Sequence, residues 1–295
     1  MPDVNVFWDP SGFQLDRLGT NKYIRSTDGD TPYVEMAIRM LSIDTPEVHY
    51  PGRTNPVKHD DRLKQLADWI QEGKAPIDDD LAAILQPKLA TGVAGTLQKK
   101  QGEDATTAFT DMVKEKLKKP SGRNRSVFLL AANEPFDQYG RLLAYMAPRY
   151  SSKEKAEMSF LDRSTFNLMI VDMGWAATFI IYPNLAKYRD LVLFQRVARE
   201  AVEQKKGIWA DPHTLTAYEF RACYRLFVIT DRMQKGRILT KREREAWFTR
   251  YCCDMTTREI FEPQQYHKVP PFNRVFVQPK NVNEAVGKIS LVPGD

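Results

Sequence analysis

Cysteine and histidine are scarce in this chain of 295 residues. The cysteines are Cys223, Cys252 and Cys253, and because their number is odd and two are adjacent, a disulfide framework is not expected. No C-x-x-C pair occurs, and the histidines are scattered along the chain, at His49, His59, His213 and His267. This spacing argues against a structural zinc site.

Long apolar runs are also missing. The longest apolar region, residues 168–182, is interrupted by Asp172 and stops at Pro183, so it is too short and too broken to cross a bilayer and is predicted to be a buried strand. Residues 1–15 lack the apolar core of a secretory signal. The default expectation is a cytoplasmic protein with no membrane contact, or a secreted one if a signal has been removed.

The overall composition is that of a soluble protein with one or two domains. Hydrophobic residues make up 42% of the chain, and no internal repeat or low-complexity tract is present. The formal net charge is +5 and the pI is near 8.9. A positive balance favours polyanionic partners modestly, although a solvated basic surface explains it equally well.

A short apolar stretch with charged flanks, IRMLSIDTPE, occupies residues 38–47. Residues 39–43 can extend as a strand, whereas Pro46 cannot continue a hydrogen-bonded ladder. Asp44 and Glu47 are therefore expected at the edge between a strand and a loop. Carboxylate oxygens at such an edge are positioned to hold a hard cation.

Three further motifs lie before and after this stretch, in a fixed order. They are DGDT at 28–31, DQYGRLLAY at 137–145, and YPN at 182–184 followed by a helical pattern that ends in KKGIW at 205–209. Each is weak alone, but all four in this order resemble the staphylococcal nuclease family over about residues 22–209. The resemblance implies an α+β fold built on a five-stranded OB-fold β-barrel with helices, and calcium-dependent cleavage of phosphodiester bonds in DNA and RNA.

The same resemblance implies a metal site and a base. Asp30 and Asp44 would be carboxylate ligands of Ca²⁺, and the main-chain carbonyl of Thr45 would be a third ligand, a mixed oxygen set that calcium accepts. Glu47 would hold or deprotonate the attacking water, which requires a carboxylate within hydrogen-bond reach.

Substrate contacts are implied in the same way. Arg39 and Arg141 would grip the phosphate from two sides, because a guanidinium fork donates two parallel hydrogen bonds to phosphate oxygens. Tyr139 and Tyr182 resemble the family's nucleotide-contacting tyrosines. Gln138 stands where a lysine often occurs in the family, which predicts weaker phosphate binding there.

The chain departs from the family pattern in two places. Arg39 comes only nine positions after Asp30, which is shorter than the usual hairpin between these motifs. Residues 48–102, which are 55 in number, replace a short loop. A structureless loop of that length is rare, and apolar spacing predicts two helices, one around 63–70 and one around 81–85. They would form a helical flap that orders substrate or covers a barrel face.

The expected organisation is an N-terminal arm at 1–19, a nuclease domain at 20–211 with a helical insertion at about 48–102, and a mixed helix and strand extension at 212–295. Further helices are predicted at 105–117, 184–205, 218–229 and 240–251, the last opened by a capping box. Further extended segments are predicted at 126–131, 141–146, 272–277 and 288–292.

The favoured function is a nuclease of low sequence specificity. One alternative is a non-catalytic OB-fold module that binds nucleic acid or protein. A second alternative makes the barrel a platform and places the function in the extension at 212–295. The preference between DNA and RNA, the mode of cleavage and the oligomeric state stay open.

Overall fold

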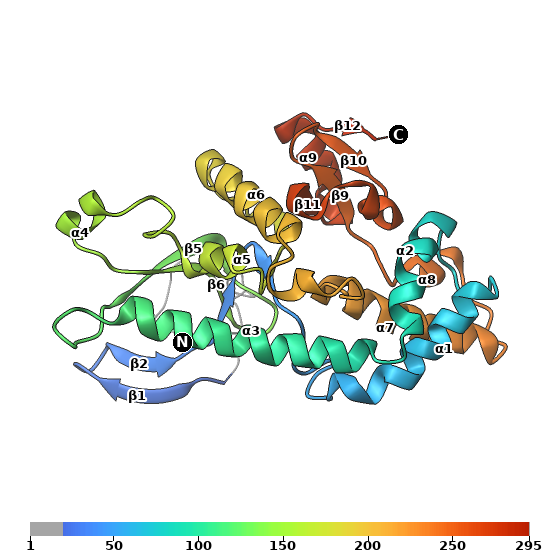
Figure 1. Cartoon of the computed structure of the whole chain (residues 1–295), viewed down its shortest axis with the longest axis horizontal. Helices are drawn as coiled ribbons and strands as arrows, with labels where there is room; N and C mark the ends of the chain where they lie inside the picture. Colours follow the sequence, from blue (N-terminus) through green and yellow to red (C-terminus); the bar gives the residue numbers. More distant parts are fainter. Residues whose placement is uncertain (1–19, 295) are drawn as a thin grey trace, which may run out of the picture. The chain divides into compact units, whose positions relative to one another are not determined.

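A computed structural model describes residues 20–294 as a mixed α+β structure (Figure 1). The chain divides into two compact units. The first unit comprises residues 20–39 and 130–144, and the second comprises residues 40–129 and 145–294. The insertion at 48–102 and the extension after 211 both belong to the second unit.

A β-hairpin forms one part of the first unit. Strand β1 (Lys22–Ser26) pairs antiparallel with β2 (Pro32–Glu35), on either side of the DGDT motif at 28–31. Strand β3 (Ile38–Met40) belongs to a three-stranded sheet of the order β3-β6-β5. Strands β5 (Val127–Phe136) and β6 (Leu142–Pro148) confirm the extended segments predicted around 126–131 and 141–146.

The insertion is helical, as its apolar spacing predicted. It contains the turn η1 (Pro56–His59) and the helices α1 (Asp60–Gln71), α2 (Asp79–Ala90) and α3 (Ala94–Leu117). The helix predicted at 105–117 is the second half of α3. The Asp60 carboxylate accepts from the backbone N–H groups of Gly95 and Thr96, at 2.6 and 3.0 Å, and so satisfies two amides that the first turn of α3 leaves unpaired.

One core joins the insertion to the extension. Helices α1 and α2 lie beside α7 (Ala217–Gln234) (Figure 1). Leu66 of α1, Leu85 of α2 and Leu226 of α7 belong to the same apolar cluster and are almost completely buried. Because each helix buries its apolar stripe against the others, the insertion and the extension stabilise one another.

The strand predicted at 168–182 is wrong over its first part. Residues Phe166–Asp172 form helix α5, and the short strands β7 (Ala177–Thr178) and β8 (Ile180–Tyr182) follow it. The Thr165 side chain caps α5 by accepting from the backbone N–H of Leu168 at 3.2 Å. All-apolar runs carry no periodicity, so a buried helix and a buried strand look alike in sequence.

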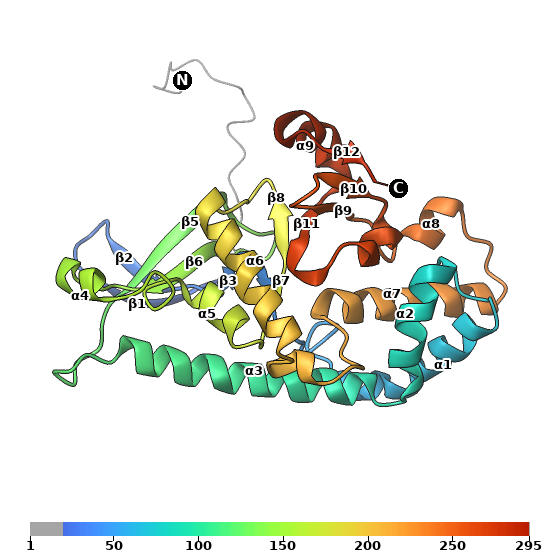
Figure 2. The same ribbon diagram turned by 45° about the horizontal axis from the view of Figure 1, so that its top comes forward.

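The second unit also contains a five-stranded sheet among its described residues, in the order β12-β10-β9-β11-β8. Its extension strands are β9 (Tyr251–Asp254), β10 (Glu259–Phe261), β11 (Arg274–Val277) and β12 (Val292–Pro293). Strand β8 pairs in parallel with β11 and lies beside it in Figure 2. The extension therefore completes a sheet that begins with a strand of the nuclease-like segment.

The remaining helices test the other predictions. Helix α6 (Tyr188–Glu203) confirms the amphipathic helix predicted at 184–205, and α7 confirms the helix at 218–229. The capping box at Thr240 is present, but α8 (Lys241–Glu245) ends early, so the prediction that it runs to Tyr251 is wrong. Helix α4 is Ser152–Glu157, and α9 (Val282–Ile289) extends into the segment predicted to be extended at 288–292.

Within residues 20–294, no helix has both the length and the apolar character needed to span a bilayer.

Candidate active site

Strand β4 (Ile43–Asp44) carries the first candidate residue. It pairs antiparallel with β7, with Ile43 opposite Thr178 and Asp44 opposite Ala177. The pairing ends at Asp44, and Pro46 follows two positions later, at the strand-to-loop edge that the sequence predicted. Asp44 is only 2% exposed, while Glu47 lies half-buried in the loop that follows.

An arginine of helix α7 binds both carboxylates. The Nη2 atom of Arg221 lies 2.5 Å from Oδ2 of Asp44, and its Nη1 atom lies 2.5 Å from Oε1 of Glu47. Burial alone would lower the pKa of the Arg221 guanidinium, but the Asp44 and Glu47 carboxylates outweigh this effect and raise that pKa above its ordinary value. The two acidic side chains that the sequence placed at one edge therefore meet on a single cation.

Arg221 was missed by the sequence reasoning. It lies 177 residues from Asp44 and outside the segment that resembles the nuclease family. The sequence places it on the predicted helix 218–229, where a charged side chain normally marks a solvated face. Only tertiary packing turns this position toward β4.

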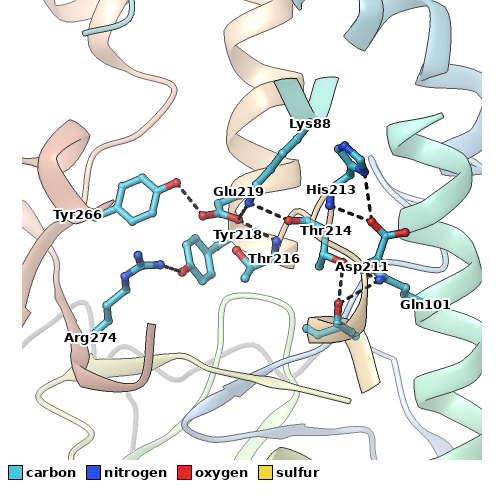
Figure 3. Close-up of polar contacts among 11 residues, drawn as sticks. Lys88, Gln101, Asp211, His213, Thr214, Thr216, Tyr218, Glu219, Tyr266 and Arg274 are labelled. Atoms are coloured by element: carbon cyan, nitrogen blue, oxygen red, sulfur yellow. Dashed lines mark hydrogen bonds and ion pairs between the residues drawn. The ribbon is translucent and has the colours of Figure 1, made fainter. Parts of the chain in front are cut away.

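Buried polar contacts hold the first turn of α7 in place (Figure 3). The Glu219 carboxylate accepts from the backbone N–H of Thr216 and from the Tyr266 hydroxyl, each at 2.9 Å, and the Lys88 ammonium lies 4.0 Å away. Burial raises the pKa of Glu219, but Lys88 and Arg274 outweigh it, so the pKa lies below its ordinary value. Glu219 thus stays charged and ties α7 to Lys88 of α2 and to Tyr266, further along the extension.

A second contact fixes the neighbouring ring. Nη1 of Arg274 donates to the Tyr218 hydroxyl at 2.5 Å, and its Nε donates to the Val269 carbonyl at 2.7 Å (Figure 3). Burial raises the pKa of Tyr218 to about 12, so its hydroxyl stays protonated at working pH. Tyr218 and Glu219 are both anchored, and Arg221 follows them on α7. The helix therefore holds Arg221 rigidly beside the Asp44 and Glu47 carboxylates.

Four of the predicted site residues lie in the first unit. Asp30 is exposed in the hairpin turn and accepts from the Thr31 hydroxyl at 3.2 Å, and Arg39 is half-buried on β3. Arg141 is half-buried, and its Nε and Nη2 atoms both lie 2.7 Å from Oδ2 of Asp137. The ring of Tyr139, 71% exposed, lies 5.4 Å from the Arg141 guanidinium.

The other four predicted residues lie in the second unit. Asp44 and Glu47 meet on Arg221, and Thr45 lies half-buried between them in sequence. Tyr182 is 5% exposed, and its side chain belongs to the apolar cluster that packs α9 on the five-stranded sheet. The meeting of the residues of the first unit with those of the second stays a prediction.

The chemistry of Asp44 and Glu47 fits a calcium ion, because calcium prefers carboxylate and carbonyl oxygens. Within residues 20–294, no group of three or more histidine, cysteine, aspartate or glutamate side chains is arranged to hold a metal. The Asp44 oxygens already accept from Arg221, so a bound cation would share this carboxylate with the guanidinium.

Comparison with known proteins places the chain in a family. Residues 37–211, more than half of the chain, match the staphylococcal nuclease homologue family, and the chain belongs to that family. It is also similar to endonuclease YhcR of Bacillus subtilis (strain 168), with 25% identity over 191 residues. That alignment covers 64% of this chain and 13% of the relative, so the chain matches only a small part of YhcR.

Proposed function

We propose that the chain is a calcium-dependent nuclease that hydrolyses phosphodiester bonds of DNA and RNA with low sequence specificity. The observation that carries the proposal is the pair of carboxylates, Asp44 and Glu47, held together at the end of β4 inside the family segment. Similarity to an endonuclease supports the same reaction class. The five-stranded OB-fold barrel of the family is part of this proposal.

In this proposal Glu47 is the general base. Its half-buried carboxylate would accept a proton from the water that attacks phosphorus, while the P–O bond to the leaving sugar oxygen breaks. Arg39 and Arg141 would donate to the phosphoryl oxygens as negative charge builds up on them.

Calcium would be held by Asp30, by Asp44 and by the Thr45 carbonyl. When bound, it would withdraw charge from the phosphoryl group. Tyr139 is exposed enough to contact a nucleotide, and Tyr182 is kept as a predicted contact although little of its surface is exposed.

One observation favours the alternative, a non-catalytic module that binds nucleic acid. Arg221 forms ion pairs with the carboxylates of both Asp44 and Glu47, and a guanidinium so placed offsets the negative charge that calcium would bind. The nuclease proposal requires that Glu47 still reaches the attacking water with Arg221 present.

A cleavage assay separates the two functions. Plasmid DNA and RNA would be incubated with the full chain in calcium, in magnesium and in chelator. We expect calcium-dependent cleavage of both substrates, and we expect Glu47→Gln to lower the rate about a hundredfold or more while oligonucleotide binding persists.

Glu72→Gln is the matched control, because Glu72 is exposed at the end of α1 and pairs only locally with Lys74. It should cleave at the wild-type rate. Strand binding without cleavage under every metal condition would support the non-catalytic module instead.

A further inference from the structure

Arg221 has a second role, as part of the wall of a pocket in the second unit. The pocket has a volume of about 100 Å³. Its lining includes the guanidinium groups of Arg221, Arg225 and Arg250 and the rings of Phe179, Tyr218 and Phe276. Because Arg221 also binds Asp44 and Glu47, the pocket directly adjoins the candidate active site.

The aromatic rings form a rigid floor and leave little surface for stacking. Phe179 and Tyr218 stack at 5.2 Å with an interplanar angle of 9°, and Phe276 packs against both rings. All three are at most 6% exposed. The guanidinium carbons of Arg221 and Arg250 lie 5.9 and 5.4 Å from the centre of the Phe179 ring. The surface that a ligand would meet is therefore mainly cationic.

Two of the arginines are held by neutral groups. Nε of Arg225 donates to the Trp247 carbonyl at 3.0 Å. With the Gln278 amide turned so that its oxygen faces Arg250, that oxygen accepts from Nε and Nη2 at 3.0 and 3.3 Å. These contacts fix the two guanidinium planes and, as far as residues 20–294 are concerned, leave both Nη atoms of Arg225 and the Nη1 atom of Arg250 for a further acceptor.

The charge of the pocket is only partly balanced, because Asp44 and Glu47 pair with Arg221 and only Asp44 also acts on Arg250. Among residues 20–294, neither Arg225 nor Arg250 forms an ion pair with a carboxylate. Burial, together with the neighbouring Arg221, lowers the pKa of both Arg225 and Arg250 below the ordinary value. An anion in the pocket would relieve this repulsion, and phosphate matches the fork geometry of guanidinium groups.

We propose that Arg221, Arg225 and Arg250 bind a non-scissile phosphate of the nucleic-acid strand that is cleaved beside Glu47. The inference rests on the proposed function. A volume of about 100 Å³ exceeds what one water needs by several-fold, yet it is well below the roughly 300–1,000 Å³ of sites that enclose whole small molecules. The pocket therefore suits a phosphate group better than a complete nucleotide.

Binding of a labelled single-stranded oligonucleotide in chelator, which prevents cleavage, tests the pocket. Fluorescence anisotropy would give Kd across a salt series for the full chain and for a variant with both Arg225→Gln and Arg250→Gln. We expect Kd to rise roughly tenfold, and the slope of log Kd against log salt to fall by about 0.7 for each phosphate that the variant no longer neutralises.

Two further variants serve as controls. Arg237→Gln with Arg242→Gln removes the same charge from exposed positions and should leave the slope unchanged. Arg225→Lys with Arg250→Lys keeps the charge, so it should keep the slope while losing part of the affinity. Thermal unfolding of every variant shows whether weaker binding reflects a loss of fold.

The outcomes separate the pocket from the reaction. If the wild type cleaves and the double glutamine variant binds with the wild-type slope, the phosphate subsite is wrong and the nuclease proposal stands. If binding depends on the two arginines but no metal supports cleavage, the hydrolysis is wrong and the pocket stands as a nucleic-acid site. A wild type that neither binds the oligonucleotide nor cleaves DNA or RNA in calcium overturns both.

Discussion

Replacement of Arg221 by methionine should destabilise the fold measurably. Arg221→Met keeps most of the apolar stem but removes the guanidinium that binds Asp44 and Glu47. Asp44 is 2% exposed, and the Arg221 and Glu47 side chains are 19% and 23% exposed, so solvent screens the ion pairs only weakly. Removal of one partner from a buried ion pair lowers the free energy of unfolding by about 3–5 kcal/mol. Because water partly reaches Glu47, we expect a loss at the lower end of this range, about 3 kcal/mol.

Calorimetry would measure this loss. About 3 kcal/mol corresponds to a decrease in Tm of roughly 5 °C, because the unfolding entropy of a chain of 295 residues is about 0.6 kcal/mol/K. A variant that adds Asp44→Asn and Glu47→Gln to Arg221→Met should regain much of the stability, because neither position then carries a buried carboxylate that has lost Arg221. Arg237→Met, at an exposed position, is the matched control and should leave Tm within about 1 °C.

Calcium provides a second readout. A ligand present at about a hundred times its Kd stabilises by about 2.7 kcal/mol. At the proposed site, calcium would share Asp44 with Arg221 in the wild type, so calcium should raise the Tm of Arg221→Met by more than it raises that of the wild type. The reasoning is refuted if Arg221→Met unfolds within about 1 °C of the wild type, or if calcium shifts both proteins equally.

Two further predictions concern the reaction and the acid stability. Arg39→Ala and Arg141→Ala should each lower kcat on DNA about a hundredfold without loss of fold, and a variant that stays fully active removes that arginine from the mechanism. The pKa of Glu219 is lowered in the fold because nearby cations, Lys88 foremost, outweigh its burial. Its contribution is therefore present above the unfolded pKa of about 4.3 and is lost as the pH falls through the lower folded pKa. Glu219→Gln should make the free energy of unfolding, measured by urea denaturation, depend less on pH over that range. An unchanged pH dependence on the acid side would contradict this.

Local pattern was sufficient for the elements with clear periodicity. Leu63, Leu66 and Ile70 recur at helical spacing, and they are the buried face of α1. Thr240 and Glu243 form the predicted capping box. Such features depend on residues within a few positions of each other, so they can be read without the rest of the chain.

Where local pattern was ambiguous, packing decided the structure. Residues 166–172 are apolar almost throughout and form a helix, because α5 is buried on nearly every side and all-round apolarity suits either element. The early end of α8 has a similar cause: Trp247 and Phe248 leave the helix and bury their rings in the core of the second unit. In both cases the competing conformations differ in burial rather than in local propensity.

The sequence by itself determined the family, the edge position of Asp44 and Glu47, and the helical nature of the insertion. The family followed from the order of the motifs, and the edge position of the two carboxylates followed from the proline after a short strand. Tertiary structure alone decided that Arg221 binds both carboxylates and that Arg225 and Arg250 share a pocket with it. The physical reason is distance along the chain: 177 residues separate Arg221 from Asp44, and only the shared core of the insertion and the extension brings α7 to the end of β4.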